Sequence, residues 1–171
     1  MDTEKELPKR KPLRLREFDY SIPGAYFITI GTQDKKQVLS RIVGGDVPDA
    51  PNKVELLPFG QIADKYINQL HRFYNDVKVD RYVIMPNHIH MILFVLENGA
   101  SRTSPPTRQH SAVSRFVSTL KRFCNKEYGE SIWQRGFHDH IIRDREDHGK
   151  HLRYIAENPL YWHTDELYVK A

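Results

Sequence analysis

The sequence predicts an α+β fold of the ferredoxin-like βαββαβ type, an antiparallel sheet with helices on one face and one further helix at its carboxyl end. Two observations predict it. Segments with strand and helix periodicity follow one another in this order along the chain. The turn residues Pro86 and Asn87 lie between the two middle strands. The length of 171 residues suits a single domain.

The first strand and the first helix are predicted in the amino-terminal half. Ala25 to Thr32 is rich in aromatic and β-branched residues, which predicts a strand. Gln33 to Pro58 carries a glycine pair and three prolines, which predicts an irregular excursion with a short strand near Val38 to Ile42. From Gly60 to Tyr74 hydrophobic residues recur at helical spacing, which predicts a helix. These residues are Ile62, Tyr66, Ile67, Leu70 and Phe73.

The remaining strands and the second helix follow in the carboxyl-terminal half. Val77 to Met85 and Ile89 to Leu96 predict two strands that form an antiparallel hairpin. A polar stretch from Asn98 to His110 predicts a flexible loop or a linker. Hydrophobic periodicity then predicts a helix from Ser111 to Tyr128, and Phe137 to Arg143 is the last predicted strand.

Positive charge is concentrated in two segments, although the net charge is only +4. Lys5 to Arg16 holds six basic residues and one acid, which predicts a basic arm over residues 1–17 ahead of a single domain over residues 18–171. Asn98 to Lys126 holds six basic residues and no acid. Such segments suit a polyanion-binding surface, and a solvated tail beside an ordinary basic helix explains them equally well. The candidates for phosphate contacts are Arg10, Lys11, Arg14, Arg16, Arg115, Lys121, Arg122 and Lys126.

The sequence predicts neither a secretion signal nor a membrane segment. Residues 1–16 are highly charged and lack the apolar stretch of a signal peptide. The longest apolar run, Met91 to Leu96, is far shorter than the ~20 residues that span a bilayer. The single cysteine, Cys124, excludes an intramolecular disulfide and fits a reducing compartment. We therefore expect a soluble, cytoplasmic protein without a membrane partner.

His88 and His90 form the first candidate site. Side chains alternate across a strand, so both imidazoles point to one face, where they can reach the same divalent ion. Two histidines alone leave coordination positions open, as catalysis requires. A pair of inert, hydrogen-bonded histidines is the simpler alternative, and a second pair, His138 and His140, has the same spacing.

The last predicted helix runs from Glu146 to Asn158 and ends there because the residue before Pro159 avoids the helical region. Tyr154 and Asn158 are about one turn apart on this helix and share a face. The amide oxygen of Asn158 is a candidate third metal ligand, and Tyr154 would then lie close to the same ion. The alternative for Tyr154 is an aromatic residue of the core.

Three further residues are candidates for a supporting role. Lys150 and His151 precede Tyr154 by about one turn of the helix, so either could stabilise a phenolate or contact a phosphate oxygen. His140 is predicted on a half-exposed strand near the site, where it could support the other residues.

These residues resemble a known family. The segment Met85 to Ile92, which reads M-P-N-H-I-H-M-I, is followed by Trp133-Gln134, Tyr154-Ile155 and Asn158-Pro159. In combination they are similar to the IS200-like transposases, and most of all to the REP-associated tyrosine transposases, which are HUH single-strand nucleases. The resemblance extends from Leu13 to Trp162.

The resemblance implies a DNA-binding enzyme of DNA transposition and recombination, which cleaves and rejoins single-stranded DNA at hairpin-forming, REP-like palindromic ends. His88 and His90 match the metal-binding histidines, and Asn158 matches the position that completes the metal site. Tyr154 matches the single catalytic tyrosine on a carboxyl-terminal catalytic helix, whose attack would leave a 5′-phosphotyrosine and a free 3′-hydroxyl. Mg²⁺ or Mn²⁺ would be the cofactor, because the substrate phosphate supplies oxygen ligands. Asp139-His140 matches a family segment for which no catalytic role is carried over.

Two other functions are consistent with the residues. A ferredoxin-like sheet with aromatic strands can bind single-stranded nucleic acid without catalysis. A metal-dependent phosphodiesterase would use an activated water and form no covalent intermediate. The oligomeric state is also open, since members of the family act either as monomers or as homodimers that exchange the tyrosine helix. We expect Tyr154 to act with the histidines of its own chain.

Overall fold

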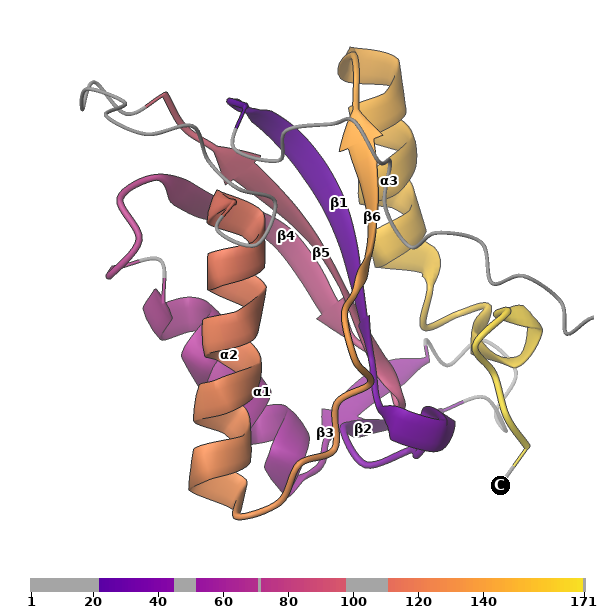
Figure 1. The fold of residues 1–171 in the computed structure, drawn as a ribbon. Helices are drawn as coiled ribbons and strands as arrows, with labels where there is room; N and C mark the ends of the chain where they lie inside the picture. Colours follow the sequence, from indigo (N-terminus) through magenta and orange to yellow (C-terminus); the bar gives the residue numbers. More distant parts are fainter. Residues whose placement is uncertain (1–21, 45–51, 71, 98–110, 171) are drawn as a thin grey trace, which may run out of the picture.

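The computed structural model describes residues 22–44, 52–70, 72–97 and 111–170, and it has the predicted ferredoxin-like order (Figure 1). Four strands form an antiparallel sheet in the spatial order β4-β5-β1-β6. These strands are β1 (Gly24–Gly31), β4 (Val77–Ile84), β5 (His88–Val95) and β6 (His138–Ile142). The α-helices of the described ranges are α1 (Pro58–Leu70), α2 (Ala112–Tyr128) and α3 (Arg145–Glu157). The described ranges also contain two 3₁₀ turns, η1 (Gln33–Lys35) and η3 (Trp162–Thr164).

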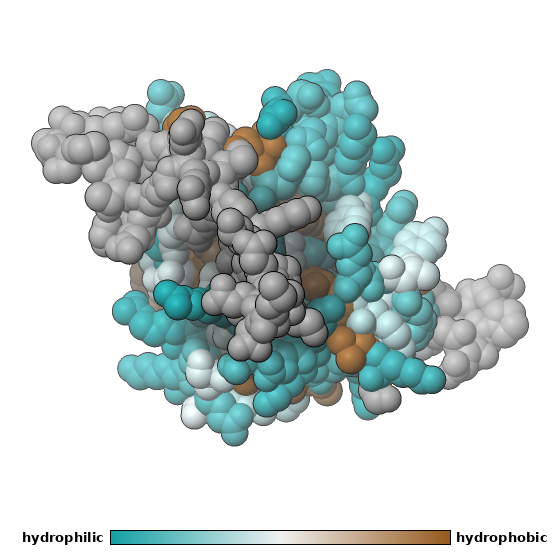
Figure 2. All heavy atoms as spheres, turned by 45° about the vertical axis from the view of Figure 1, so that its right-hand side comes forward, coloured by the Kyte–Doolittle hydropathy of each residue, from teal (hydrophilic) through white to brown (hydrophobic). Residues whose placement is uncertain are grey.

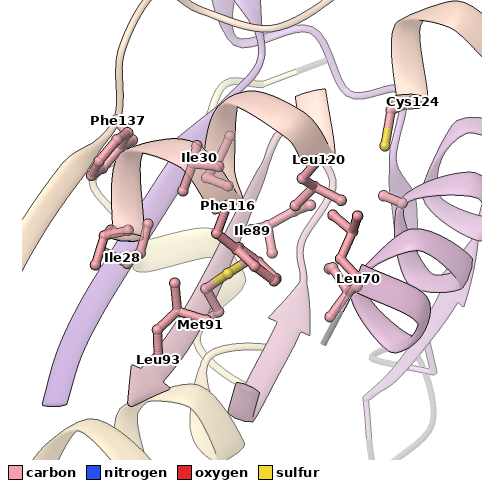
Figure 3. Packing of buried hydrophobic residues seen from close by; sticks show 14 of the residues in the cluster. Ile28, Ile30, Leu70, Ile89, Met91, Leu93, Phe116, Leu120, Cys124 and Phe137 are labelled. Carbon is pink, nitrogen blue, oxygen red and sulfur yellow. The ribbon is translucent and has the colours of Figure 1, made fainter. Parts of the chain in front are cut away.

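The main hydrophobic core lies between the sheet and the helices α1 and α2, which cover one of its faces (Figure 1). Ile28 of β1 and Ile89 and Met91 of β5 are fully buried on this face, against Phe116 and Leu120 of α2 (Figure 3). Fully burying a side chain of this size contributes about 1.5–3 kcal/mol. This core fixes β5, and therefore the residues that alternate with Ile89 and Met91, at the centre of the sheet.

The helix α3 packs on the opposite face of the sheet, where the core is smaller (Figure 1). Ile155 of α3 contacts a cluster that contains Ile92 of β5 and Ile142 of β6. The helix begins at a capped end, because the side chain of Asp144 accepts a hydrogen bond from the backbone N–H of Asp147 at 2.8 Å. Because side chains alternate along β5, the residues between its core positions face α3.

Two predictions of secondary structure were wrong in part. The helix α1 ends at Leu70 rather than at Tyr74, because the chain tightens into i→i+3 hydrogen bonds such as that from Phe73 N to Leu70 O. Phe73 is consequently 75% exposed instead of buried. The excursion after β1 contains a paired hairpin of β2 (Ser40–Val43) and β3 (Lys53–Leu56), of which only the first strand was predicted.

Several sequence predictions fall outside the described residues. They are the basic arm over residues 1–17, with Arg10, Lys11, Arg14 and Arg16, and the polar stretch from Asn98 to His110. Within the part of the chain that the structure describes, no helix combines the length and the apolar character needed to cross a membrane.

Candidate active site

His88 and His90 lie side by side at the start of β5, with ring centroids 4.4 Å apart. Both rings are buried. Nδ1 of His88 lies 2.8 Å from Oδ1 of Asn87, and Nδ1 of His90 lies 2.9 Å from Oγ1 of Thr29 on the paired strand β1. Among the described residues, Nε2 of either ring has no hydrogen-bond partner. Each ring therefore has one nitrogen held by the protein and one nitrogen available to a ligand.

Asn87 fixes the tautomer of His88. Its Nδ2 donates hydrogen bonds to the backbone oxygens of Lys35, at 3.3 Å, and of Leu167, at 2.8 Å, so its Oδ1 faces the imidazole. An amide oxygen can only accept a hydrogen bond, and Nδ1 of His88 must therefore carry the hydrogen. The lone pair is then on Nε2, the nitrogen that is buried without a partner.

Both histidines are held in the neutral form that a metal ligand requires. Burial, with a smaller contribution from the charge of Lys35, lowers the pKa of His88 to about 3. Burial also lowers the pKa of His90 well below its usual value, and the neighbouring His88 acts in the same direction. Two adjacent neutral imidazoles with free Nε2 atoms fit a divalent ion of the Mn²⁺ to Zn²⁺ series.

The buried pair predicts that the metal-free protein loses stability in mild acid. The folded-state pKa values lie below the unfolded value of 6.5, so the unfolded chain binds protons first as the pH falls. Stability is retained above pH 6.5 and decreases below it, by up to about 1.4 kcal/mol per pH unit for each histidine. Urea unfolding in EDTA at pH 7, 6 and 5 measures this slope. A His90→Gln variant should lose close to half of it, and an unchanged slope would contradict the assignment.

The helix α3 brings Tyr154 and Asn158 to the histidine pair of the same chain. The ring of Tyr154 lies 5.1 Å from that of His90 and 5.9 Å from that of Phe27. Tyr154 is 45% exposed, so it is not an aromatic residue of the core. Asn158 is buried, and its Oδ1 has no hydrogen-bond partner among the described residues. The four residues singled out in the sequence are therefore gathered in one place.

Asp165 lies at the same place and was missed in the sequence. One carboxylate oxygen of Asp165, one ring nitrogen of His88 and one ring nitrogen of His90 lie within 4.8 Å of one another. Oδ2 of Asp165 accepts hydrogen bonds from Nδ2 of Asn158 at 3.0 Å and from the hydroxyl of Tyr154 at 3.4 Å. Partial burial, followed by the charge of Asp165, raises the pKa of Tyr154 to about 12. No periodicity marks Asp165, because it follows the last predicted helix and lies in no predicted element.

The three supporting candidates lie on or beside α3. Lys150 forms an ion pair with Glu146 at 2.8 Å. The rings of His140 and His151 stack with their centroids 4.7 Å apart. Asp147 lies between them, with its carboxylate 2.9 Å from Nε2 of His140 and 3.2 Å from Nδ1 of His151. The potential ligand atoms of His140, Asp147 and His151 lie close enough together to form a second possible metal-binding group.

A cavity of about 480 Å³ opens beside Tyr154. Its lining combines the aromatic ring of Phe27 with the polar side chains of His138, Lys150, His151 and Asp165. Figure 2 turns the α3 side of the molecule forward, and there hydrophilic residues predominate among those described, with hydrophobic ones in small separate groups. The cavity is therefore suited to a polar ligand with a flat face, such as a nucleotide.

The predicted phosphate contacts of α2 lie away from this site, because α2 covers the other face of the sheet (Figure 1). Arg115 forms an ion pair with Asp76, and Nζ of Lys121 donates a hydrogen bond to the backbone oxygen of Gln134 at 2.8 Å. Arg122 and Lys126 are exposed. A role of these residues in binding DNA stays a prediction.

The candidate site thus combines paired histidines on a strand of a ferredoxin-like sheet with a tyrosine on the carboxyl-terminal helix. No protein-family model matches the chain. A protein of Haemophilus influenzae, provisionally named a REP-associated tyrosine transposase, is 29% identical over 150 residues, which cover 83% of this chain and 73% of that protein. The REP-associated tyrosine transposase of Escherichia coli is 30% identical over 83 residues, 48% of this chain and 44% of that protein.

The fold is shared with a solved structure as well. The structure of a REP-associated tyrosine transposase bound to a REP hairpin matches with a TM-score of 0.60 and 22% sequence identity, over 87% of this chain and 73% of that one. This chain is therefore similar in sequence and in fold to REP-associated tyrosine transposases.

Proposed function

We propose that this chain cleaves and rejoins single-stranded DNA through a covalent bond to Tyr154, at a site where His88, His90 and Asn158 hold a divalent metal. The observation that carries the proposal is the half-exposed side chain of Tyr154 beside the ring of His90, which with His88 offers two buried imidazole nitrogens that have no partner among the described residues. The buried amide oxygen of Asn158 adds a third donor of the kind that Mg²⁺ and Mn²⁺ accept.

Tyr154 needs assistance to act as a nucleophile. Its raised pKa keeps the phenol protonated at neutral pH, where it is a poor nucleophile. When bound, Mg²⁺ or Mn²⁺ would polarise the scissile phosphate and stabilise the charge that develops there. The phenol gives up its proton to the solvent as its oxygen forms the new bond to phosphorus. The bond to the 3′-oxygen breaks, and that oxygen takes up a proton. The product keeps one phosphodiester, so a 3′-hydroxyl can reverse the step and join strands.

The substrate that fits best is an unpaired segment next to a DNA hairpin. The related solved structure is described as bound to a REP hairpin. In this chain, the cavity beside Tyr154 has room for a nucleotide, and its lining combines the aromatic ring of Phe27 with polar side chains. The basic side chains of the arm and of α2 would add phosphate contacts, whose contribution weakens as salt is added.

The experiment is to incubate the full chain with labelled single-stranded DNA that carries a hairpin and an unpaired flank. With Mn²⁺ we expect a protein–DNA adduct that survives denaturing electrophoresis, and with EDTA we expect none. A metal-dependent phosphodiesterase would release cut DNA without an adduct, and a binding module would leave the DNA intact. Either of these two results contradicts the proposal.

A further inference from the structure

We infer that Asp165 is an additional ligand of the metal, delivered to the histidine pair by the chain segment that follows α3. This inference rests on the proposed metal site at His88 and His90, and it adds the carboxylate that this site otherwise lacks. The three residues lie together, since one potential ligand atom from each is within 4.8 Å of the other two.

Without Asp165, the proposed ligand set carries no negative charge. An imidazole that binds a metal through the lone pair of Nε2 is neutral, as is the amide of Asn158, so these three donors offer no negative charge to a dication. Mg²⁺ and Mn²⁺ favour carboxylate oxygens, and Mg²⁺ in proteins is usually held by one or two carboxylates together with substrate phosphate. Asp165 supplies such a carboxylate where both free Nε2 atoms are located.

The carboxylate of Asp165 is held in place from both sides. Its Oδ1 accepts a hydrogen bond from the backbone N–H of Leu167 at 2.6 Å, and its Oδ2 accepts one from Nδ2 of Asn158 at 3.0 Å. The hydrogen bond from Asn158 leaves Oδ1 of that amide buried and without a partner among the described residues. One amide group thus orients the carboxylate and keeps its own oxygen available as a ligand.

The segment around Asp165 is tied to the same residue that orients His88. Nδ2 of Asn87 donates a hydrogen bond to the backbone oxygen of Leu167 at 2.8 Å, while its Oδ1 accepts from Nδ1 of His88 at 2.8 Å. Nζ of Lys35 adds a hydrogen bond to the backbone oxygen of Glu166 at 3.1 Å. The turn before β5 and the segment after α3 therefore position the imidazole and the carboxylate relative to each other through Asn87.

Mn²⁺ binding to the full chain without DNA tests the inference, by isothermal titration calorimetry after the metal has been removed with EDTA. Asp165→Asn preserves the shape of the side chain, and we expect it to weaken Mn²⁺ binding by about tenfold or more. Glu166→Gln is the matched control, because Glu166 is the neighbouring acid and lines the same cavity without belonging to the group of potential ligands. It should change the affinity by less than about twofold. Thermal unfolding of each metal-free variant establishes that it is folded.

Three results would overturn the inference: wild-type affinity in Asp165→Asn, equal weakening in both variants, or no Mn²⁺ binding by the wild-type chain. Equal weakening would mean that negative charge in the cavity attracts the ion without ligation by Asp165. The covalent chemistry is tested separately. If the wild-type chain forms no DNA adduct and Asp165→Asn still weakens Mn²⁺ binding selectively, the proposed nucleophile is wrong and the assignment of Asp165 holds.

Discussion

Tyr154→Phe is expected to abolish the covalent protein–DNA adduct, with a loss of at least about 10³-fold in its rate of formation. The substitution removes only the hydroxyl that would form the bond to phosphorus. This hydroxyl forms a long hydrogen bond of 3.4 Å to Asp165 and belongs to a half-exposed side chain, so stability should change by less than about 0.5 kcal/mol. Denaturing gels of labelled hairpin DNA with Mn²⁺ measure the adduct, and gel shifts in native buffer measure binding.

Tyr161→Phe is the matched control for this substitution. Tyr161 is 61% exposed and follows the same helix, so its side chain is at least as accessible to solvent as that of Tyr154. We expect Tyr161→Phe to form the adduct as the wild-type chain does. Both variants should bind the DNA with the same affinity. An adduct that persists in Tyr154→Phe and disappears in Tyr161→Phe would show that Tyr161, and not Tyr154, is the nucleophile.

His90→Ala is expected to weaken Mn²⁺ binding by at least about 100-fold and to reduce adduct formation in proportion at a limiting metal concentration. The substitution removes a buried imidazole that is already aligned by Thr29 and whose Nε2 has no protein partner among the described residues. Calorimetry measures the affinity. Adduct formation over a range of Mn²⁺ concentrations tests whether excess metal restores part of the activity.

His138→Ala tests the second histidine pair of the sequence. His138 lines the cavity beside Tyr154, but it belongs to neither group of potential metal ligands in the described structure. We therefore expect Mn²⁺ affinity to stay within about twofold of the wild-type value. Equal losses in His90→Ala and His138→Ala would contradict the choice between the two pairs.

The elements that the sequence predicted best are those with strong local signals. The helix α2 was predicted to within one residue, because Ser111 caps its first turn and Gly129 ends it with a positive φ of 90°. The strand β5 was recognisable because it is hydrophobic on both faces, one against α2 and the other against α3. The end of α1 and the strand β3 were missed because tertiary contacts and hydrogen bonds, rather than hydrophobic periodicity, determine them.

The residues of the candidate site also differ in whether a local sequence pattern marks them. His88, His90, Tyr154 and Asn158 could be singled out because strand and helix periodicity places each pair on one face, and the structure gathers both pairs. Asp165 could not be singled out, because hydrogen bonds from Leu167 and Asn158 hold it and no local pattern encodes them. Its place at the site depends on the path of the chain after Pro159.

The most direct test of the proposed function is to identify the residue that carries the DNA. The wild-type chain is incubated with single-stranded hairpin DNA and Mn²⁺, the adduct is isolated under denaturing conditions, and nuclease and protease digests are analysed by mass spectrometry. We predict a nucleotide attached through its 5′-phosphate to Tyr154. A nucleotide on any other residue, or a 3′-phosphate linkage at Tyr154, would contradict the proposed chemistry.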